Sequence, residues 1–189
     1  MLVLASKSPR RKELLSLITT DFIVKSAEVD ETLPQGISPE EAVLYLSKIK
    51  AEPLKNETDT VIGADTIVVL EGKILGKPHN DEEAFSMLRD LSGREHSVFT
   101  GVTVISPESE KSFYRETKVK FSELSDREIR DYIATGECRD KAGAYGIQGY
   151  GSVFVESICG DYFNVVGLPV SALYRALKQW SIFVDFNRK

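Results

Sequence analysis

Residues 61–70 read Val61-Ile62-Gly63-Ala64-Asp65-Thr66-Ile67-Val68-Val69-Leu70, an almost continuous apolar and β-branched run. Such a run is typical of a central strand that is buried on both faces, and Glu71-Gly72-Lys73 follows it as a turn that leads the chain back. The run therefore predicts the middle of a sheet, and the neighbouring segments can be assigned outward from it.

The flanking segments alternate between strand-like and helix-like patterns. Ser38-Pro39-Glu40-Glu41 supplies an N-cap, a proline in the first turn and a glutamate at the third helical position, and Ser125 with Glu128 repeats the capping pattern. Further strands are predicted at 2–5, 22–24, about 97–105, about 112–121 and 152–158, and helices at 9–18, 38–52, 80–92, 125–135 and 169–180. Hairpins and crossovers both occur in this order, so the sequence predicts an α/β chain with a mixed sheet in one domain, 1–189.

The bulk composition narrows the class of protein. The chain has 189 residues, 42% hydrophobic and 28% charged, with a net charge of −5, and its isoelectric point is about 5.2. An acidic chain does not suit a protein that coats nucleic acid, and no run approaches the length of a signal peptide or a membrane span. Cys138 and Cys159 show no metal or redox spacing, which fits a reducing compartment. We expect a cytoplasmic protein without a nucleic-acid or membrane partner.

Asp65 is unusual because it is an ionisable side chain inside the apolar strand. Its burial costs a few kcal/mol unless it finds a partner. A local pairing near the end of the strand is one explanation; the other is that Asp65 binds a metal ion or activates a water. Thr66 points to the opposite face if the strand is regular, and Gly63 is compatible with a bend or with the close approach of a ligand.

A basic turn follows the first apolar segment, 2–5. Four of six consecutive residues are basic: Lys7, Arg10, Arg11 and Lys12. At a strand-to-helix turn, the backbone N–H groups, the hydroxyls of Ser6 and Ser8 and the two guanidiniums can face one phosphate cluster. A solvated basic helix start is the alternative. However, cations at a helix N-terminus oppose its dipole by about 0.3–1 kcal/mol each unless an anion binds there.

Other charged residues are less distinctive. Glu28, Asp30 and Glu31 form an acidic turn, and one of them meeting Asp65 would complete a magnesium site, since Mg²⁺ takes one or two protein carboxylates together with water and phosphate oxygens. Lys50 lies on a helix whose orientation the sequence leaves open. Lys77 lies in the turn Leu75-Gly76-Lys77-Pro78. Lysines in such places are more often surface residues than ligands.

Residues 140–149 contain a glycine-rich loop, Gly143-Ala144-Tyr145-Gly146-Ile147-Gln148-Gly149. Such a loop is either a tight turn or a surface that a flat ligand can approach closely. The amide of Gln148 carries a donor and an acceptor, so it can read an imide or pyrimidine edge. Motifs for P-loop, dinucleotide, α/β-hydrolase and zinc-protease sites are missing from the sequence.

Taken together, several motifs resemble the Maf family of nucleoside triphosphate pyrophosphatases across the whole chain. They are Ala5-Ser6-Lys7-Ser8-Pro9-Arg10-Arg11-Lys12-Glu13-Leu14-Leu15, Gly63-Ala64-Asp65-Thr66, Gly76-Lys77-Pro78, Leu91-Ser92-Gly93-Arg94 and Asp140-Lys141-Ala142-Gly143-Ala144-Tyr145-Gly146-Ile147-Gln148-Gly149. The resemblance implies an inosine-triphosphatase-like fold with two lobes flanking a phosphate-binding cleft, and a homodimer. It also implies that a divalent cation, Mg²⁺ or Mn²⁺, assists attack of water on the α-phosphate, giving a nucleoside monophosphate and pyrophosphate.

The resemblance assigns roles by position. Asp65 matches the family's proposed base, and Glu31 with Asp65 matches its metal-binding acids. The positions that hold the triphosphate are Ser6, Ser8, Arg10, Arg11, Lys50 and Lys77, and those associated with base selectivity are Arg10, Thr66 and Gln148. The pattern is similar to the branch that acts on dTTP and UTP in a house-cleaning role that can include modified pyrimidine nucleotides, whereas another branch prefers 7-methyl-GTP.

One alternative function stays open. Family members are linked to arrest of septum formation, so the chain could be a nucleotide-binding regulator of cell division without significant turnover. A carboxylate such as Asp65 repels a polyanionic ligand unless a metal intervenes, which favours the enzyme over the pure binder.

Overall fold

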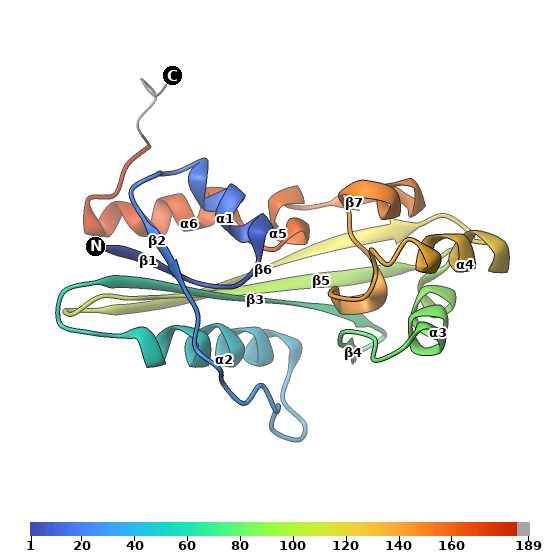
Figure 1. Cartoon of the computed structure of the whole chain (residues 1–189), viewed down its shortest axis with the longest axis horizontal. Helices are drawn as coiled ribbons and strands as arrows, with labels where there is room; N and C mark the ends of the chain where they lie inside the picture. The colour runs from blue at the N-terminus through green and yellow to red at the C-terminus, as the bar shows by residue number, and fades with distance from the viewer. Residues whose placement is uncertain (185–189) are drawn as a thin grey trace. The chain divides into compact units, whose positions relative to one another are not determined.

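We describe a computed structural model of the chain, which defines residues 1–184 (Figure 1). Within these residues, seven strands form one mixed sheet in the order β2-β1-β3-β5-β6-β7, and β4 pairs with β3. The strands are β1 (Leu2–Ala5), β2 (Ile23–Lys25), β3 (Thr60–Leu70), β4 (Lys73–Leu75), β5 (Glu95–Ile105), β6 (Glu110–Phe121) and β7 (Val155–Cys159). Strand β1 is parallel to β2 and β3, whereas β3–β4 and β6–β7 are antiparallel. The predicted α/β class with a mixed sheet is confirmed.

Two of the helices begin at the N-caps that the sequence predicts, Ser38 and Ser125. The α-helices are α1 (Pro9–Ser16), α2 (Pro39–Ala51), α3 (Asp81–Leu91), α4 (Asp126–Ala134), α5 (Tyr162–Val166) and α6 (Val170–Leu177), and the 3₁₀ segments are η1 (Glu52–Leu54), η2 (Ala142–Ala144), η3 (Gly149–Phe154) and η4 (Lys178–Trp180). Reciprocal capping boxes join Ser38 to Glu41 and Ser125 to Glu128. An N-cap of this kind stabilises a helix by about 1 kcal/mol, so these starts are decided locally.

Three elements differ from the predictions. The last strand begins at Val155 rather than at 152, because Gly149–Phe154 curl into a 3₁₀ segment that buries Phe154. Strand β4 was not predicted. It forms because Glu71 and Gly72, with φ of 49° and 81°, make a two-residue hairpin turn after β3. The short helix α5 was not predicted either.

The chain divides into two compact units. The first contains Met1–Asp65, Thr100–Arg115 and the chain from Gly167, and the second contains Thr66–Phe99 and Glu116–Val166. The prediction of one domain over 1–189 extends to residues outside the described part and stays a prediction.

In the first unit, α2 lies on one face of the strands, and α1 and α6 lie on the other (Figure 1). Two glycines let α2 approach closely. A Cβ atom on Gly63 would lie 2.1 Å from the carbonyl oxygen of Ser47, and one on Gly101 would lie 2.2 Å from that of Val43. Since Val43 and Ser47 are one helical turn apart, the backbone of α2 rests on glycines of two neighbouring strands. The space beside Gly63 that we expected for a ligand or a bend is taken by this helix.

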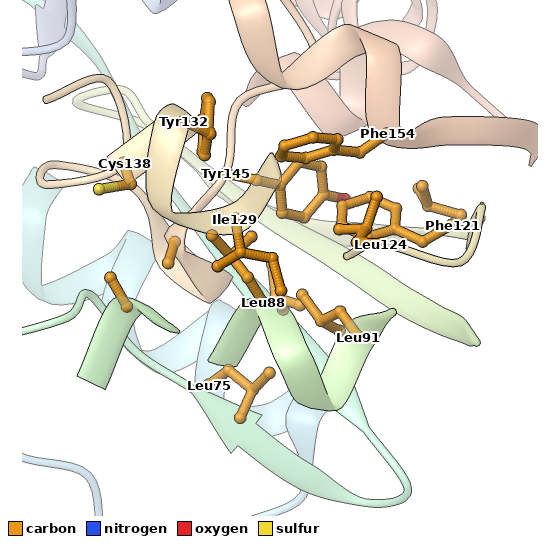
Figure 2. Packing of buried hydrophobic residues seen from close by; sticks show 14 of the residues in the cluster. Leu75, Leu88, Leu91, Phe121, Leu124, Ile129, Tyr132, Cys138, Tyr145 and Phe154 are labelled. Atoms are coloured by element: carbon orange, nitrogen blue, oxygen red, sulfur yellow. The ribbon is translucent and has the colours of Figure 1, made fainter. Parts of the chain in front are cut away.

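In the second unit, buried side chains from α3, α4 and the strands form one hydrophobic cluster (Figure 2). Phe121 packs edge-on against Tyr145, with ring centroids 4.7 Å apart. Buried His96 joins this cluster, and its Nε2 lies 2.8 Å from the hydroxyl of Tyr145. Burial lowers the pKa of His96 to about 4, so the imidazole is neutral at neutral pH.

None of the helices within residues 1–184 combines the length and apolar character that a membrane crossing demands.

Candidate functional site

The centre of the site is a lysine held between two carboxylates. The ammonium of Lys50 donates a hydrogen bond to Asp65 Oδ1 and another, of 2.8 Å, to Glu31 Oε2. Asp65 lies in the middle of β3 with its side chain 12% exposed, whereas the side chain of Glu31 is 51% exposed. The structure therefore gives Asp65 the partner that its burial demands, and it selects Glu31 from the acidic turn.

Local packing explains how Lys50 reaches Asp65. Gly63 and Asp65 are two residues apart in β3, so they face the same side of the strand, and Gly63 faces α2. Lys50 lies one turn beyond Ser47, the residue whose carbonyl oxygen contacts Gly63. The helix face that rests on the glycine thus presents Lys50 to the carboxylate, which settles the orientation that the sequence left open.

The guanidinium of Arg11 belongs to the same centre. Its Nε donates to the carbonyl oxygen of Gly167 at 2.9 Å. Burial lowers the pKa of Arg11, the charges of Asp65 and Glu31 oppose that shift, and the charge of Arg10 adds to it. Arg11 therefore lies in the electrostatic field of both carboxylates and of Arg10, and it adds a second cation to the centre beside Lys50.

Ser6 and Ser8 shape the turn that carries the arginines. Ser8 caps α1, and its Oγ accepts from the N–H of Arg11, while the Oγ of buried Ser6 accepts from the N–H of Ser8 at 3.1 Å. Both hydroxyls act as acceptors in these bonds, so each O–H proton is left to be donated to an anion. Lys7 and Lys12 in the same turn are exposed.

The donor set around Lys50 suits a divalent cation that is bridged to substrate. Asp65 and Glu31 already converge on one cation, the Lys50 ammonium. Among residues 1–184, no three His, Cys, Asp or Glu side chains cluster so as to hold a metal without help. Mg²⁺ commonly uses one or two protein carboxylates and completes its shell with water and phosphate oxygens. The residues therefore fit a divalent cation, which Asp65 and Glu31 would hold.

The remaining predicted residues lie in the second unit. Lys77 is exposed, and the carbonyl oxygen of the preceding Gly76 accepts from the N–H of Gly143 at 3.0 Å, which ties this turn to the glycine-rich loop. Gln148 is exposed in that loop and follows buried Ile147. Two 3₁₀ segments, η2 and η3, shape the loop.

Thr66 follows Asp65 in β3, which continues without interruption from Thr60 to Leu70. Adjacent side chains of a regular strand point to opposite faces. Thr66 therefore lies on the face of β3 away from α2, and it and Asp65 do not share one side of the strand.

The sequence reasoning missed one residue that organises this centre and gave another a different role. Gly167 has φ of 127°, a conformation that glycine adopts readily, and its carbonyl oxygen fixes Arg11. Gly63 was singled out, but as a site of bending or ligand approach rather than as the seat of a helix. For Gly167, the available signal was its place directly before Leu168-Pro169. For Gly63, no neighbouring residue indicated that α2 packs against it.

Comparison with solved structures supports the fold. The chain is similar to a HAM1 protein from Coxiella burnetii, with a TM-score of 0.52 and 11% identity over 94% of this chain and 98% of that one. At this identity the likeness concerns the fold alone, and it agrees with the predicted inosine-triphosphatase-like class.

Curated relatives are much closer in sequence. Proteins named dTTP/UTP pyrophosphatase from Bacillus cereus (strain B4264), Geobacillus sp. (strain WCH70) and Carboxydothermus hydrogenoformans are 50%, 52% and 54% identical to this chain. The alignments cover 97%, 94% and 94% of this chain and 97% of each relative. Residues 1–180 also match the family described as Maf-like protein. On the family match and these identities, the chain belongs to the Maf-like protein family.

Proposed function

We propose that this chain is a pyrophosphatase that hydrolyses dTTP and UTP to the nucleoside monophosphate and pyrophosphate. The observation that carries the proposal is the Asp65–Lys50–Glu31 centre beside Arg11. It combines carboxylates, which suit water activation and metal binding, with cations, which suit a polyphosphate. Relatives about 50% identical over nearly the whole chain bear the name dTTP/UTP pyrophosphatase, which supports this reaction and these substrates.

The basic turn binds the phosphates in this proposal. Arg10 and Arg11 can each offer paired N–H donors to phosphate oxygens, and the hydroxyls of Ser6 and Ser8 can donate from the start of α1. Arg11 is already oriented by Gly167, so little side-chain entropy is lost when an anion binds. Lys77 is proposed as a further phosphate ligand from its match to the family motif.

Asp65 prepares the attacking water. Its carboxylate lies on a central strand and is held by Lys50, so it can accept a water proton from a fixed position. A divalent cation, Mg²⁺ or Mn²⁺, held by Asp65 and Glu31 would supply charge neutralisation on the phosphates. Lys50, held between the two carboxylates, is proposed as a further ligand of the triphosphate from its match to the family motif.

Base selectivity is proposed to involve Arg10, Thr66 and Gln148. The Gln148 amide can donate to the C4 carbonyl oxygen and accept from the N3–H of uracil or thymine. This pairing explains a preference for the imide edge that dTTP and UTP share. The homodimer, the cytoplasmic location, modified pyrimidine substrates and a part in septum formation stay predictions from the family resemblance.

The deciding experiment is a screen of nucleoside triphosphates with Mg²⁺ or Mn²⁺, in which pyrophosphate and orthophosphate are measured separately. We expect pyrophosphate from dTTP and UTP at rates well above those for CTP, dATP and 7-methyl-GTP. Orthophosphate as the first product would indicate a phosphatase and contradict the proposal. Tight binding of dTTP without either product would favour the nucleotide-binding regulator instead.

A further inference from the structure

The loop that carries Gln148 is tied to a carboxylate behind it. Glu137, just beyond the end of α4, accepts from the N–H of Tyr150 at 2.9 Å through Oε2 and from the N–H of Gly151 at 3.0 Å through Oε1. Both donors lie within three residues of Gln148. The C-terminal side of the loop is therefore fixed by one side chain.

Tyr132 extends this attachment to the other side of the loop. Its hydroxyl donates to Glu137 Oε1 at 3.1 Å and accepts from the N–H of Gly146 at 3.2 Å. The ring is 4% exposed and packs edge-on against Phe154, with centroids 5.0 Å apart, inside the hydrophobic cluster (Figure 2). Gly146 is thus bonded to the Tyr132 hydroxyl directly, and residues 150–151 are bonded to it through Glu137. The hydrophobic cluster keeps the phenol ring in place.

The glycines of the loop leave room for these two side chains. A Cβ atom on Gly149, which has φ of 72°, would lie 2.4 Å from Glu137 Oε2. A Cβ atom on Gly151 would lie 3.0 Å from the hydroxyl of Tyr132 and 2.4 Å from the carbonyl oxygen of Gly146. The backbone on both sides of Gln148 is therefore shaped around the Glu137–Tyr132 pair.

Glu137 acts here as an acceptor only. Burial raises the pKa of its carboxyl, but the N–H groups of Gly151 and Tyr150, with the Tyr132 hydroxyl, outweigh burial and lower that pKa overall. An ionised carboxylate has no proton to donate, so it matches two N–H groups and an O–H at once. A glutamine in its place would turn one acceptor atom into an NH₂ group facing an N–H.

We propose that Glu137 is a positioning residue for base selectivity: with Tyr132, it sets the backbone from Gly146 to Gly151 so that the Gln148 amide faces the pyrimidine edge in one orientation. This inference rests on the proposed function, because it assumes that Gln148 reads the base. It adds Glu137 to the residues proposed for base selectivity, as one that acts through the loop without contacting the nucleotide.

UTP and CTP give the sharpest comparison, because the two bases differ in the donor and acceptor pattern of the edge at N3 and C4. A well-oriented amide distinguishes these edges, whereas a loosely held amide can rotate to suit either one. In Glu137→Gln, we expect the ratio of kcat/KM for UTP to that for CTP to fall about tenfold. The loss should arise mainly from a higher KM for UTP, with kcat within about twofold of wild type, because the phosphate-binding residues are unchanged.

Two further variants separate positioning from general stability. Glu128→Gln is the matched control, since Glu128 also accepts from a backbone N–H and a hydroxyl, at Ser125, but at the start of α4. It is expected to lower the melting temperature without changing the UTP-to-CTP ratio. Glu137→Asp keeps the charge on a shorter arm and is expected to restore part of the ratio.

Equilibrium binding makes the result independent of turnover. The α,β-imido analogues of UTP and CTP are titrated into the same variants by calorimetry. The proposal predicts that the ratio of their dissociation constants collapses in Glu137→Gln and not in Glu128→Gln. An unchanged ratio in Glu137→Gln overturns it, as does a wild-type protein that binds both analogues equally. If the wild-type protein discriminates between the two analogues but releases no pyrophosphate, the proposed reaction is wrong. The ratio of the dissociation constants in the variants then still decides the role of Glu137.

Discussion

The carbonyl oxygen of Ser47 in α2 lies 2.1 Å from the position that a Cβ atom would take on Gly63 in β3. This contact sets the depth at which α2 packs on the sheet. Lys50 lies one turn further along the helix and Asp65 two residues further along the strand, where the two form an ion pair. The absence of one methyl group thus brings together the lysine and the carboxylate of the proposed active site.

Gly63→Ala should therefore affect stability and activity together. The added methyl group would meet backbone atoms, which cannot rotate away, so α2 must shift. We expect a loss of about 1–3 kcal/mol in the free energy of unfolding, measured by urea denaturation, and a fall in pyrophosphate release. Gly76→Ala is the control, because a Cβ atom there meets nothing within 4 Å. Equal stability of the two variants would show that the helix contact is unimportant.

Asp65→Asn tests the role of the carboxylate in the reaction. The amide preserves size but accepts a proton poorly and binds a divalent cation weakly. We expect kcat for dTTP to fall by about 10²–10⁴, with the dissociation constant of the substrate changed much less. Stopped-time pyrophosphate assays and equilibrium titration measure the two quantities. Turnover close to wild type would remove Asp65 from the mechanism.

Lys50→Met tests the proposal that the ammonium stands between two carboxylates that bind a metal. Without it, Asp65 and Glu31 repel each other and gain affinity for an added cation. We expect Mn²⁺ to bind the nucleotide-free variant more tightly than it binds wild type, as measured by electron paramagnetic resonance of free Mn²⁺, although turnover falls. Lys48→Met, which removes a surface ion pair with Glu110, should leave Mn²⁺ affinity unchanged. Weaker Mn²⁺ binding in Lys50→Met would contradict the assignment of the two acids.

His96 predicts a pH dependence of stability. Its pKa falls from 6.5 to about 4 on folding, so the unfolded chain binds the proton more tightly. The contribution of neutral His96 to the free energy of unfolding is fully present above pH 6.5 and is lost as the pH falls toward 4. At pH 5 the free energy of unfolding is lower by about 2 kcal/mol. His96→Gln should flatten the denaturation free energy between pH 6.5 and 5, whereas His79→Gln, at an exposed position, should not. The same slope in both variants would exclude His96 as its source.

Gln148→Glu directly tests the proposal that Gln148 reads the base. A carboxylate only accepts hydrogen bonds, so it repels the C4 carbonyl oxygen of uracil and thymine. We expect kcat/KM for dTTP and UTP to fall about tenfold or more. Because the side chain is exposed, the free energy of unfolding should change by less than about 0.5 kcal/mol. An unchanged nucleotide profile would argue against Gln148 as a selectivity residue.

Much of the fold could be predicted because its signals are local. The capping boxes of Ser38 and Ser125 fixed two helix starts through bonds that span three residues. The apolar run 61–70 predicted the central strand, and the turn after it forms the β3–β4 hairpin. The boundary of β7 was missed because it depends on the burial of Phe154 in the cluster with Tyr132, a contact between residues far apart in sequence.

By itself, the sequence determined the chemistry that this protein carries. A carboxylate buried in an apolar strand demands a partner, and cations crowded at a helix start favour an anion, whatever the rest of the chain does. The family resemblance named Glu31 and Lys50 by position. Only the tertiary structure showed that both meet Asp65 in one set of contacts, that Gly167 orients Arg11, and that Glu137 holds the Gln148 loop. Such contacts depend on how closely helices and loops pack together in space, and no pattern of neighbouring residues encodes that distance.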